Sequence, residues 1–161
     1  MENTMKETVI PIIQCTREKR DRFIEILRIT RKQTLALAGQ STEQLMKHIQ
    51  HKQEHIDAID RLDDRLNCLY AQVGHRLDTA GNNDKDGNLY PDNNCLMQLI
   101  SETKELMKQI YDIEQRNKEI ITARINRLKL KIQDLNLRKK SQGAYNQRVK
   151  TTGGVYIDSK S

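Results

Sequence analysis

A long helical repeat in the middle of the chain constrains the fold more than any other feature. From Leu45 to Leu77, alternating steps of four and three residues reach ten positions, of which eight are apolar or aromatic. That spacing places them on one face of a helix. Ser41 and Gln44 precede the repeat at the spacing of a capping box, which satisfies backbone N–H groups where a helix begins. We therefore predict a helix over about residues 42–78.

A second repeat lies upstream. The same steps connect Phe23, Leu27, Thr30, Thr34 and Leu37, and Gly39 offers the left-handed residue that ends many helices. Pro11 fits the first turn of a helix but not its interior, so we expect this helix over about residues 12–38. Only about three residues then separate it from the next helix, and the two should turn back on each other as an antiparallel hairpin.

The third repeat is the longest. Apolar residues recur from Leu96 to Leu135, which predicts a helix over about residues 93–140. Beyond it the period stops, and glycines and threonines indicate a flexible basic tail over residues 141–161. The fold class that we predict is all-α: an antiparallel three-helix coiled-coil bundle over residues 1–140 with a long third helix, followed by the flexible C-terminal tail.

The polar stretch over residues 79–92 is predicted to be a loop. Its sequence NNDKDGN at residues 82–88 resembles the first half of an EF-hand calcium loop. The second half does not fit, because Pro91 interrupts it and Asn93 occupies the position of the bidentate glutamate. Asn, Asp and Gly are also the usual residues of turns. We predict no metal site, although the sequence leaves calcium binding by this loop open.

Three histidines, His48, His51 and His55, lie on one side of the second predicted helix. The sequence between them is not the HExxH motif that places a glutamate beside a zinc-bound water, so we expect a solvated helix face. A nucleophile elbow, a phosphate-binding glycine loop and a convergent pair of acids are all missing from the sequence. We predict neither an enzyme nor a cofactor.

Neither a membrane span nor a secretion signal is predicted. The longest apolar run, residues 9–13, is interrupted by Pro11 and is far shorter than the roughly 20 residues that cross a bilayer. The chain also begins without the basic and apolar regions of a secretion signal. Cys15, Cys68 and Cys95 form no CxxC pair, which is typical of reduced thiols. We expect a cytoplasmic protein that does not insert into membranes.

The positive charge is concentrated at one end of the chain. Residues 1–120 carry 18 basic and 20 acidic side chains, whereas residues 121–161 carry 10 basic and 2 acidic ones. A basic cluster of this kind attracts nucleic acid or an acidic partner, but it also suits the negative end of a helix dipole. Because no nucleic-acid-binding motif accompanies it, we predict no nucleic acid partner. A coiled-coil nucleic-acid-binding or scaffold protein is the alternative function.

The unequal lengths of the predicted helices leave apolar surface without a neighbour. A hairpin of shorter helices cannot cover the whole third helix, and an exposed apolar stripe is typical of a site that holds another amphipathic helix. The sequence leaves open that these apolar stripes are covered by other parts of the same chain or by a second copy in a homodimer. The residues that we predict to bind a partner are Ile121, Ile125, Leu128, Ile132 and Leu135 in the third helix and Leu69 and Val73 in the second.

Several segments together resemble one known family. Residues 23–37 and 45–62 are similar to its first helical hairpin. Residues 114–121 (EQRNKEII) are similar to its glutamate-rich stretch with a central asparagine, and residues 144–146 and 154–158 to its C-terminal tail. The family is that of the FlgN-type flagellar export chaperones, with its FliT-like relatives.

The resemblance implies a cytosolic helical chaperone that uses no ATP, metal or cofactor. Such chaperones bind the C-terminal helical segments of hook-associated proteins of the FlgK and FlgL type. They keep these proteins unassembled and deliver them to the gate of the flagellar type III export apparatus. In related chaperones, tyrosines of the C-terminal segment contribute to gate contact, so the resemblance makes Tyr145 and Tyr156 candidates for docking to an export gate component.

Overall fold

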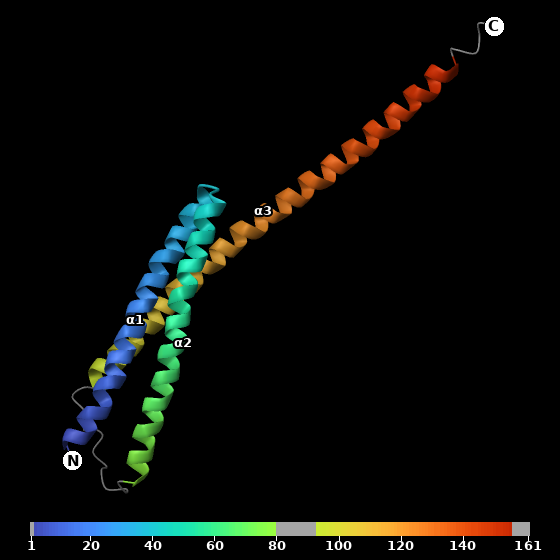
Figure 1. Ribbon diagram of the computed structural model, residues 1–161. Coiled ribbons are helices and arrows are strands. Elements are labelled where there is room, and N and C mark those ends of the chain that lie inside the picture. Colours follow the sequence, from blue (N-terminus) through green and yellow to red (C-terminus); the bar gives the residue numbers. More distant parts are fainter. Residues whose placement is uncertain (1, 80–92, 156–161) are drawn as a thin grey trace. The chain divides into compact units, whose positions relative to one another are not determined.

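Three helices make up almost all of the structure. The computed structural model describes residues 2–79 and 93–155 (Figure 1), and no strand occurs within these ranges. The predicted all-α fold class is therefore confirmed. The helices are α1, Glu2–Ala38, α2, Thr42–Thr79, and α3, Asn93–Val155.

The chain divides into two units, residues 1–117 and residues 118–161. The first unit contains α1, α2 and the beginning of α3, and the second contains the rest of α3. The sequence at residues 82–88 that resembles part of an EF-hand loop lies outside the described residues. The unit boundary falls within α3, and the extent of the predicted bundle over residues 1–140 stays a prediction.

Helix α1 begins earlier than predicted. We expected a start near residue 12, because proline has no N–H to donate and its ring crowds the preceding turn. The helix instead runs from Glu2 with Pro11 inside it. Directly after the proline, Ile12 and Cys15 are 3% and 2% exposed and belong to a core cluster with α2. The burial of such side chains, roughly 1.5–3 kcal/mol for an isoleucine, helps to offset the cost of an interior proline, about 3 kcal/mol.

Helix α1 ends in a turn whose left-handed residue is Gln40, and not Gly39 as expected. Gln40 has a φ of 56°, and the backbone N–H of Ser41 donates to the carbonyl of Ala36 at 3.1 Å, as in a Schellman motif. The N–H of Gly39 still donates to the carbonyl of Leu35 at 2.9 Å. Because Gly39 completes this helical hydrogen bond, the chain reverses one residue later than predicted.

Helix α2 matches its predicted bounds to within one residue. The N–H of Gln44 donates to the Ser41 hydroxyl at 3.4 Å, and the N–H of Leu45 donates to the Ser41 carbonyl at 3.1 Å. The first bond is the serine half of the predicted capping box. Ser41 therefore serves both as the last residue of the turn and as the start of the next helix.

Helix α3 continues to Val155, well beyond its predicted end near residue 140. We placed the end there because the apolar period stops and Gly143 follows. One glycine costs only about 1 kcal/mol relative to alanine in a helix, and residues 141–150 contain no proline, so nothing in this stretch breaks the helix. The structure therefore shows helix through Val155 in the stretch where we predicted a flexible tail, and the flexibility of residues 141–161 stays a prediction.

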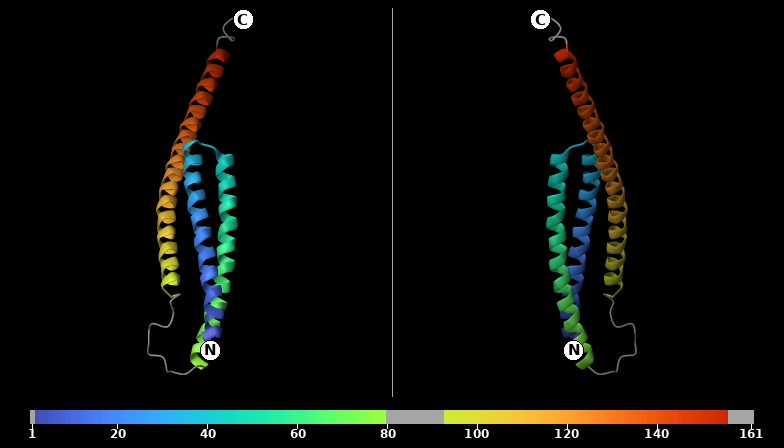
Figure 2. Two further views of the ribbon diagram at one scale, coloured as in Figure 1. Left: turned by 90° about the vertical axis from the view of Figure 1, so that its left-hand side faces the viewer. Right: turned by 90° about the vertical axis from the view of Figure 1, so that its right-hand side faces the viewer.

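The core of the first unit consists of two apolar clusters. Figure 2 shows α1 and α2 side by side, and α3 contributes residues to both clusters. The first cluster contains Ile12, Cys15, Leu62 and Leu66, with Leu69, Val73 and Leu96 packed against it. The second contains Ile26, Leu27, Ile59 and Ile110, with Phe23, Ile56, Leu106 and Ile113 packed against it.

A set of buried polar contacts also joins the three helices of this unit. Lys52, whose side chain is 9% exposed, forms an ion pair with Glu114 and donates to Gln33 Oε1 at 3.4 Å. Thr34 Oγ1 donates to Asn117 Oδ1 at 2.8 Å. A shift of one helix along another would leave the buried Lys52 ammonium unpaired, which is costly. These contacts therefore favour one register of the helices.

Candidate partner-binding surface

The five residues predicted in the third helix lie exposed on α3. Their exposed fractions range from 39% at Ile121 to 58% at Leu128. With about 100° between successive residues of a helix, they fall within an arc of about 80° and form one continuous stripe. The α3 stripe consists of Ile121, Ile125, Leu128, Ile132 and Leu135.

The environment of the apolar residues changes along α3. Within the first unit, Leu99 and Ile110 are 4% and 7% exposed. In the second unit, the described side chains of residues 118–150 are all exposed except that of Arg124, which is half-buried. The second unit is thus a solvated helix that carries an apolar stripe, and such stripes typically mark binding surfaces.

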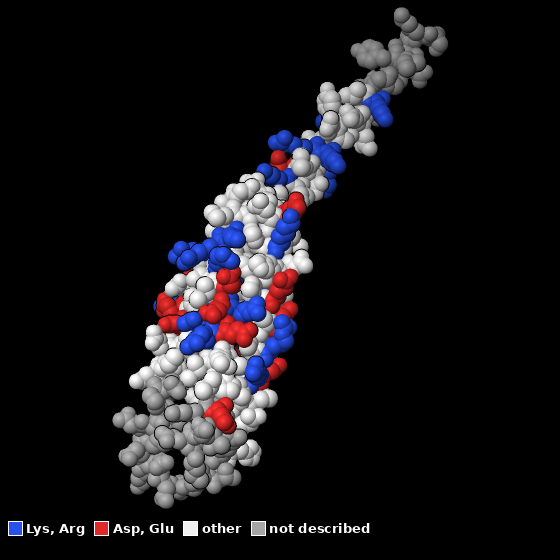
Figure 3. Space-filling view, turned by 60° about the vertical axis from the view of Figure 1, so that its left-hand side comes forward, with Lys and Arg blue, Asp and Glu red and all other residues white. Residues whose placement is uncertain are grey.

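One flank of the α3 stripe is basic. Arg124, Lys131 and Arg138 follow one another at intervals of seven residues, which places them in a row along the stripe, here called the basic row. Arg138 Nη2 also lies 3.1 Å from Asp134 Oδ2 in an exposed ion pair. Figure 3 shows that blue Lys and Arg side chains predominate toward the C-terminal end of α3. The chemistry of the surface is therefore apolar with a positive border.

Two further exposed leucines lie outside the predicted set. Leu130 and Leu137 are 65% and 67% exposed, and their spacing of seven places both on the side of α3 opposite the α3 stripe. The four-and-three steps that start at Ile121 pass over them. The sequence signal for this second row is the seven-residue spacing between the two leucines.

Leu69 and Val73 are less exposed than the residues of the α3 stripe. Both are half-buried and pack against the first core cluster, to which α1 contributes Ile12 and Cys15. We predicted Leu69 and Val73 as partner-binding residues on the assumption that this end of α2 lacks a neighbour, but α1 contributes Ile12 and Cys15 to the cluster that they contact. Partner binding by Leu69 and Val73 stays a prediction. These two residues expose less apolar surface than the α3 stripe does.

The histidines of α2 lie close to a cation of α1. The rings of His51 and His55 are 5.1 Å apart, and His55 Nδ1 lies 3.3 Å from Arg22 Nη1. Partial burial lowers the pKa of His55, and the neighbouring His51 and Arg22 lower this pKa further. His55 is thus not on the fully solvated face that we expected. The described residues contain no group of three side chains that would hold a metal ion.

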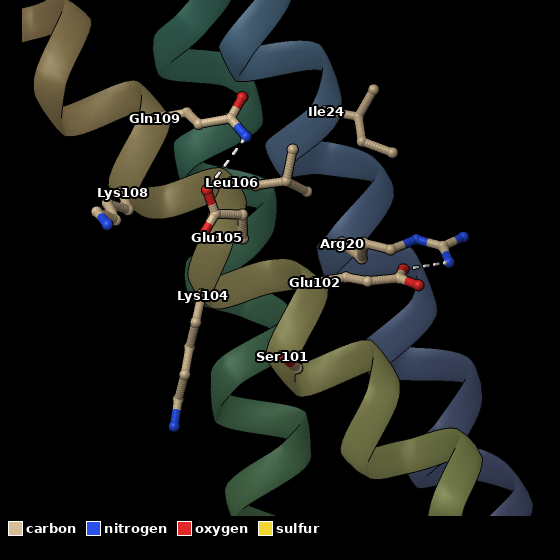
Figure 4. A pocket seen from close by; sticks show the side chains of 9 residues that line it. All are labelled: Arg20, Ile24, Ser101, Glu102, Lys104, Glu105, Leu106, Lys108 and Gln109. Carbon is tan, nitrogen blue, oxygen red and sulfur yellow. Dashed lines mark hydrogen bonds and ion pairs between the residues drawn. The ribbon is translucent and has the colours of Figure 1, made fainter.

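A hollow in the first unit, between α1 and α3, is lined mainly by charged side chains (Figure 4). Arg20 Nη1 donates to Glu102 Oε2 at 3.1 Å, and Gln109 Nε2 donates to Glu105 Oε1 at 3.5 Å. Hydrogen bonds to Asp21 and then to Glu102 raise the pKa of Arg20. Because Arg20 pairs with Glu102 and Gln109 pairs with Glu105, this hollow is typical of a solvated helix surface with surface ion pairs.

The remaining predictions concern the C-terminal tyrosines and the membrane. Tyr145 is exposed on α3, whereas Tyr156 lies outside the described residues. Docking of either residue to an export gate stays a prediction. Of the helices that the structure describes, none is long and apolar enough to cross a membrane.

Comparison with known proteins supports the resemblance seen in the sequence. The family described as FlgN protein matches residues 5–153, which is nearly the whole chain and includes most of all three helices. No match is found among curated proteins or among solved structures.

Proposed function

Because the chain belongs to the FlgN family, whose members are flagellar export chaperones, we propose that it binds the C-terminal helical segment of a hook-associated protein. Binding covers the segment's apolar face and so keeps the protein unassembled in the cytoplasm until export. The observation that carries this proposal is the exposed α3 stripe on a solvated helix. The natural occupant of such a stripe is another amphipathic helix.

The α3 stripe has enough apolar surface for reversible binding. Complete burial of a leucine or isoleucine is worth roughly 1.5–3 kcal/mol, and the five residues are between 39% and 58% exposed. Covering them would contribute roughly 4–8 kcal/mol, with a similar contribution from the partner's apolar face. After the cost of association, this total is consistent with a micromolar dissociation constant, about −8 kcal/mol. Such affinity suits a chaperone that must later release its cargo.

We also propose that the first unit is an antiparallel coiled coil. Lys19 bonds to Asp63 at 2.6 Å and Gln33 bonds to Lys52 at 3.4 Å. Residue numbers therefore rise along α1 as they fall along α2, in support of opposite directions. The role of this unit would be to anchor the beginning of α3 through the buried contacts of Glu114 and Asn117 while the cargo is bound.

The first experiment places charges in the α3 stripe. The double variant Leu128→Asp with Ile132→Asp should abolish capture of a hook-associated C-terminal segment in a pull-down, because the cargo's apolar face would then desolvate two carboxylates. The matched control is Leu130→Asp with Leu137→Asp, which makes the same change on the opposite side of α3. It should retain capture, with the same helicity by circular dichroism. Capture by the stripe variant, or loss of capture by the control variant alone, would reject the proposed surface.

The alternative is a nucleic-acid-binding or scaffold protein that uses the basic C-terminal region. The excess of basic residues over acidic ones after residue 120 favours it. A salt series separates the two functions, because phosphate binding weakens steeply with salt whereas apolar burial does not. Cargo capture should persist at several hundred millimolar salt. Capture that disappears there, together with salt-sensitive binding to duplex DNA or RNA, would favour the alternative.

Tyr145 is our candidate for contact with the export gate. It is 68% exposed and lies seven residues after Arg138, on the same side of α3. The substitution Tyr145→Ala should weaken binding to a gate component and leave cargo capture unchanged. If the Tyr145→Ala variant and the unsubstituted chain bind the gate component equally well, the result would contradict this role.

A further inference from the structure

The basic row indicates which kind of helix the α3 stripe holds. On the premise of the partner-binding function above, we propose that the occupant is an acidic amphipathic helix of another protein. This helix carries carboxylates at intervals of seven residues along one side of its apolar face. The inference rests on the charges that border the α3 stripe.

The residues bordering the apolar seam of two paired helices set the choice and orientation of the partner. Along the α3 stripe, Arg124, Lys131 and Arg138 lie on one border and Lys129 lies on the other. Residues 121–150 contain a single acidic residue, Asp134, which lies outside the basic row and pairs with Arg138. Every charged residue that borders the stripe is therefore basic, and the complementary helix is acidic.

A second copy of the chain is a poor occupant for the same reason. In a parallel pair of α3 helices, Arg124 of one copy would face Lys129 of the other. In an antiparallel pair, the two basic rows would face each other. Like charges opposed across an interface suppress a wrong partner. The charges thus argue for a different protein and against a homodimer through this surface.

The basic row also gives the minimum length of the occupant. Arg124 and Arg138 are two heptads apart, which corresponds to about 21 Å along a helix. A helix that faces the whole row therefore has at least about 15 residues, just over two heptads, with carboxylates at three positions spaced seven residues apart.

The probes for this proposal are three synthetic amphipathic peptides of about four heptads each. All have leucine at both seam positions, and they differ at the bordering positions, which are Glu, Gln or Lys. Fluorescence anisotropy measures their binding to the full-length chain at low salt. The Glu peptide should bind about tenfold more tightly than the Gln peptide, and the Lys peptide more weakly than both. Equal affinity for the Glu and Lys peptides would overturn the proposal.

Two triple variants then test whether the preference comes from the basic row. The row variant combines Arg124→Gln, Lys131→Gln and Arg138→Gln and should reduce the preference for the Glu peptide to about twofold or less. The control variant combines Arg127→Gln, Lys140→Gln and Arg148→Gln. It removes the same formal charge from positions farther from the seam and should keep most of the preference. An equal loss in both variants would indicate general electrostatic attraction and overturn the proposal.

The stripe variant Leu128→Asp with Ile132→Asp separates this inference from the proposed function. Suppose that the stripe variant binds none of the three peptides, and that the unsubstituted chain binds the Glu and Gln peptides with equal affinity. The stripe then binds helices, and only the charge inference fails. If the stripe variant still binds the peptides and the cargo segment, the proposed surface itself fails. Light scattering should show no dimer formed through α3. A dimer that the stripe variant dissociates would overturn the proposal in favour of a second copy.

Discussion

At the scale of single residues, the turn between α1 and α2 places Gln40 in a conformation that favours glycine. Its φ is 56°, a left-handed value that costs an L-residue roughly 1–2 kcal/mol. Glycine adopts it without this cost but loses more chain entropy on folding. We expect Gln40→Gly to raise the free energy of unfolding by about 1 kcal/mol, measured by urea denaturation.

The neighbouring glycine offers the matched control. A Cβ added at Gly39 would lie 3.5 Å from the carbonyl oxygen of Leu35, an ordinary contact, and Gly39 is not the left-handed residue of the turn. The substitution Gly39→Ala should therefore be neutral or slightly stabilising. A loss of stability in Gln40→Gly, or a large loss in Gly39→Ala, would contradict the turn geometry described above.

His55 makes the stability of the first unit depend on pH. Its pKa is lowered from 6.5 by partial burial and by the nearby His51 and Arg22. The unfolded chain therefore binds a proton at pH values where folded His55 stays neutral, so stability falls as the pH drops below about 6.5 and is unaffected above it. The substitution His55→Gln should remove this part of the acid sensitivity, measured by urea midpoints at about pH 7.5 and 5.5. If the urea midpoint falls equally between these two pH values in the unsubstituted chain and in the His55→Gln variant, the assignment to His55 is refuted.

At the scale of elements, the length of α3 depends on a stretch with weak sequence signals. Gly143 lies within it, and a Cβ added there would meet nothing within 4 Å. We expect Gly143→Ala to strengthen the helix locally by about 1 kcal/mol. Amide hydrogen exchange of residues 141–150 should slow, while the global melting temperature changes little because both core clusters lie elsewhere.

The substitution Gly143→Pro is the opposite test, because proline removes a helical hydrogen bond and crowds the preceding turn. Exchange in residues 141–150 should then accelerate. If neither substitution changes exchange in this stretch, residues 141–150 are not helical in solution, and the tail predicted from the sequence would be right.

At the scale of the whole molecule, the core clusters and the proposed binding surface lie in different units. Both core clusters and the Thr34–Asn117 hydrogen bond lie within residues 1–117. A chain that ends at Ala123 should therefore melt cooperatively, within about 5 °C of the full chain, yet fail to capture cargo. Circular dichroism and the pull-down described above measure the two properties. Full capture by the shortened chain would move the binding site into the first unit, to residues such as Leu69 and Val73.

Much of the fold follows from local pattern. The four-and-three spacing predicted three helices, the bounds of α2 and the start of α3, and these predictions are confirmed. The same spacing predicted the α3 stripe, whose residues are exposed as its proposed role requires. Periodicity succeeds here because a helix forms from hydrogen bonds four residues apart, so its faces can be counted along the sequence.

The sequence by itself determined which residues share a helical face, and the tertiary structure alone decided which faces are covered. Leu99 and Leu128 lie in similar repeats of one helix, yet the first is 4% and the second 58% exposed. Likewise, the repeat that starts at Leu45 places Lys52 on the same face as its apolar residues, but only the structure shows that Lys52 is buried beside Glu114. The reason is that burial depends on neighbours supplied by distant parts of the chain, whereas periodicity carries no information about those neighbours.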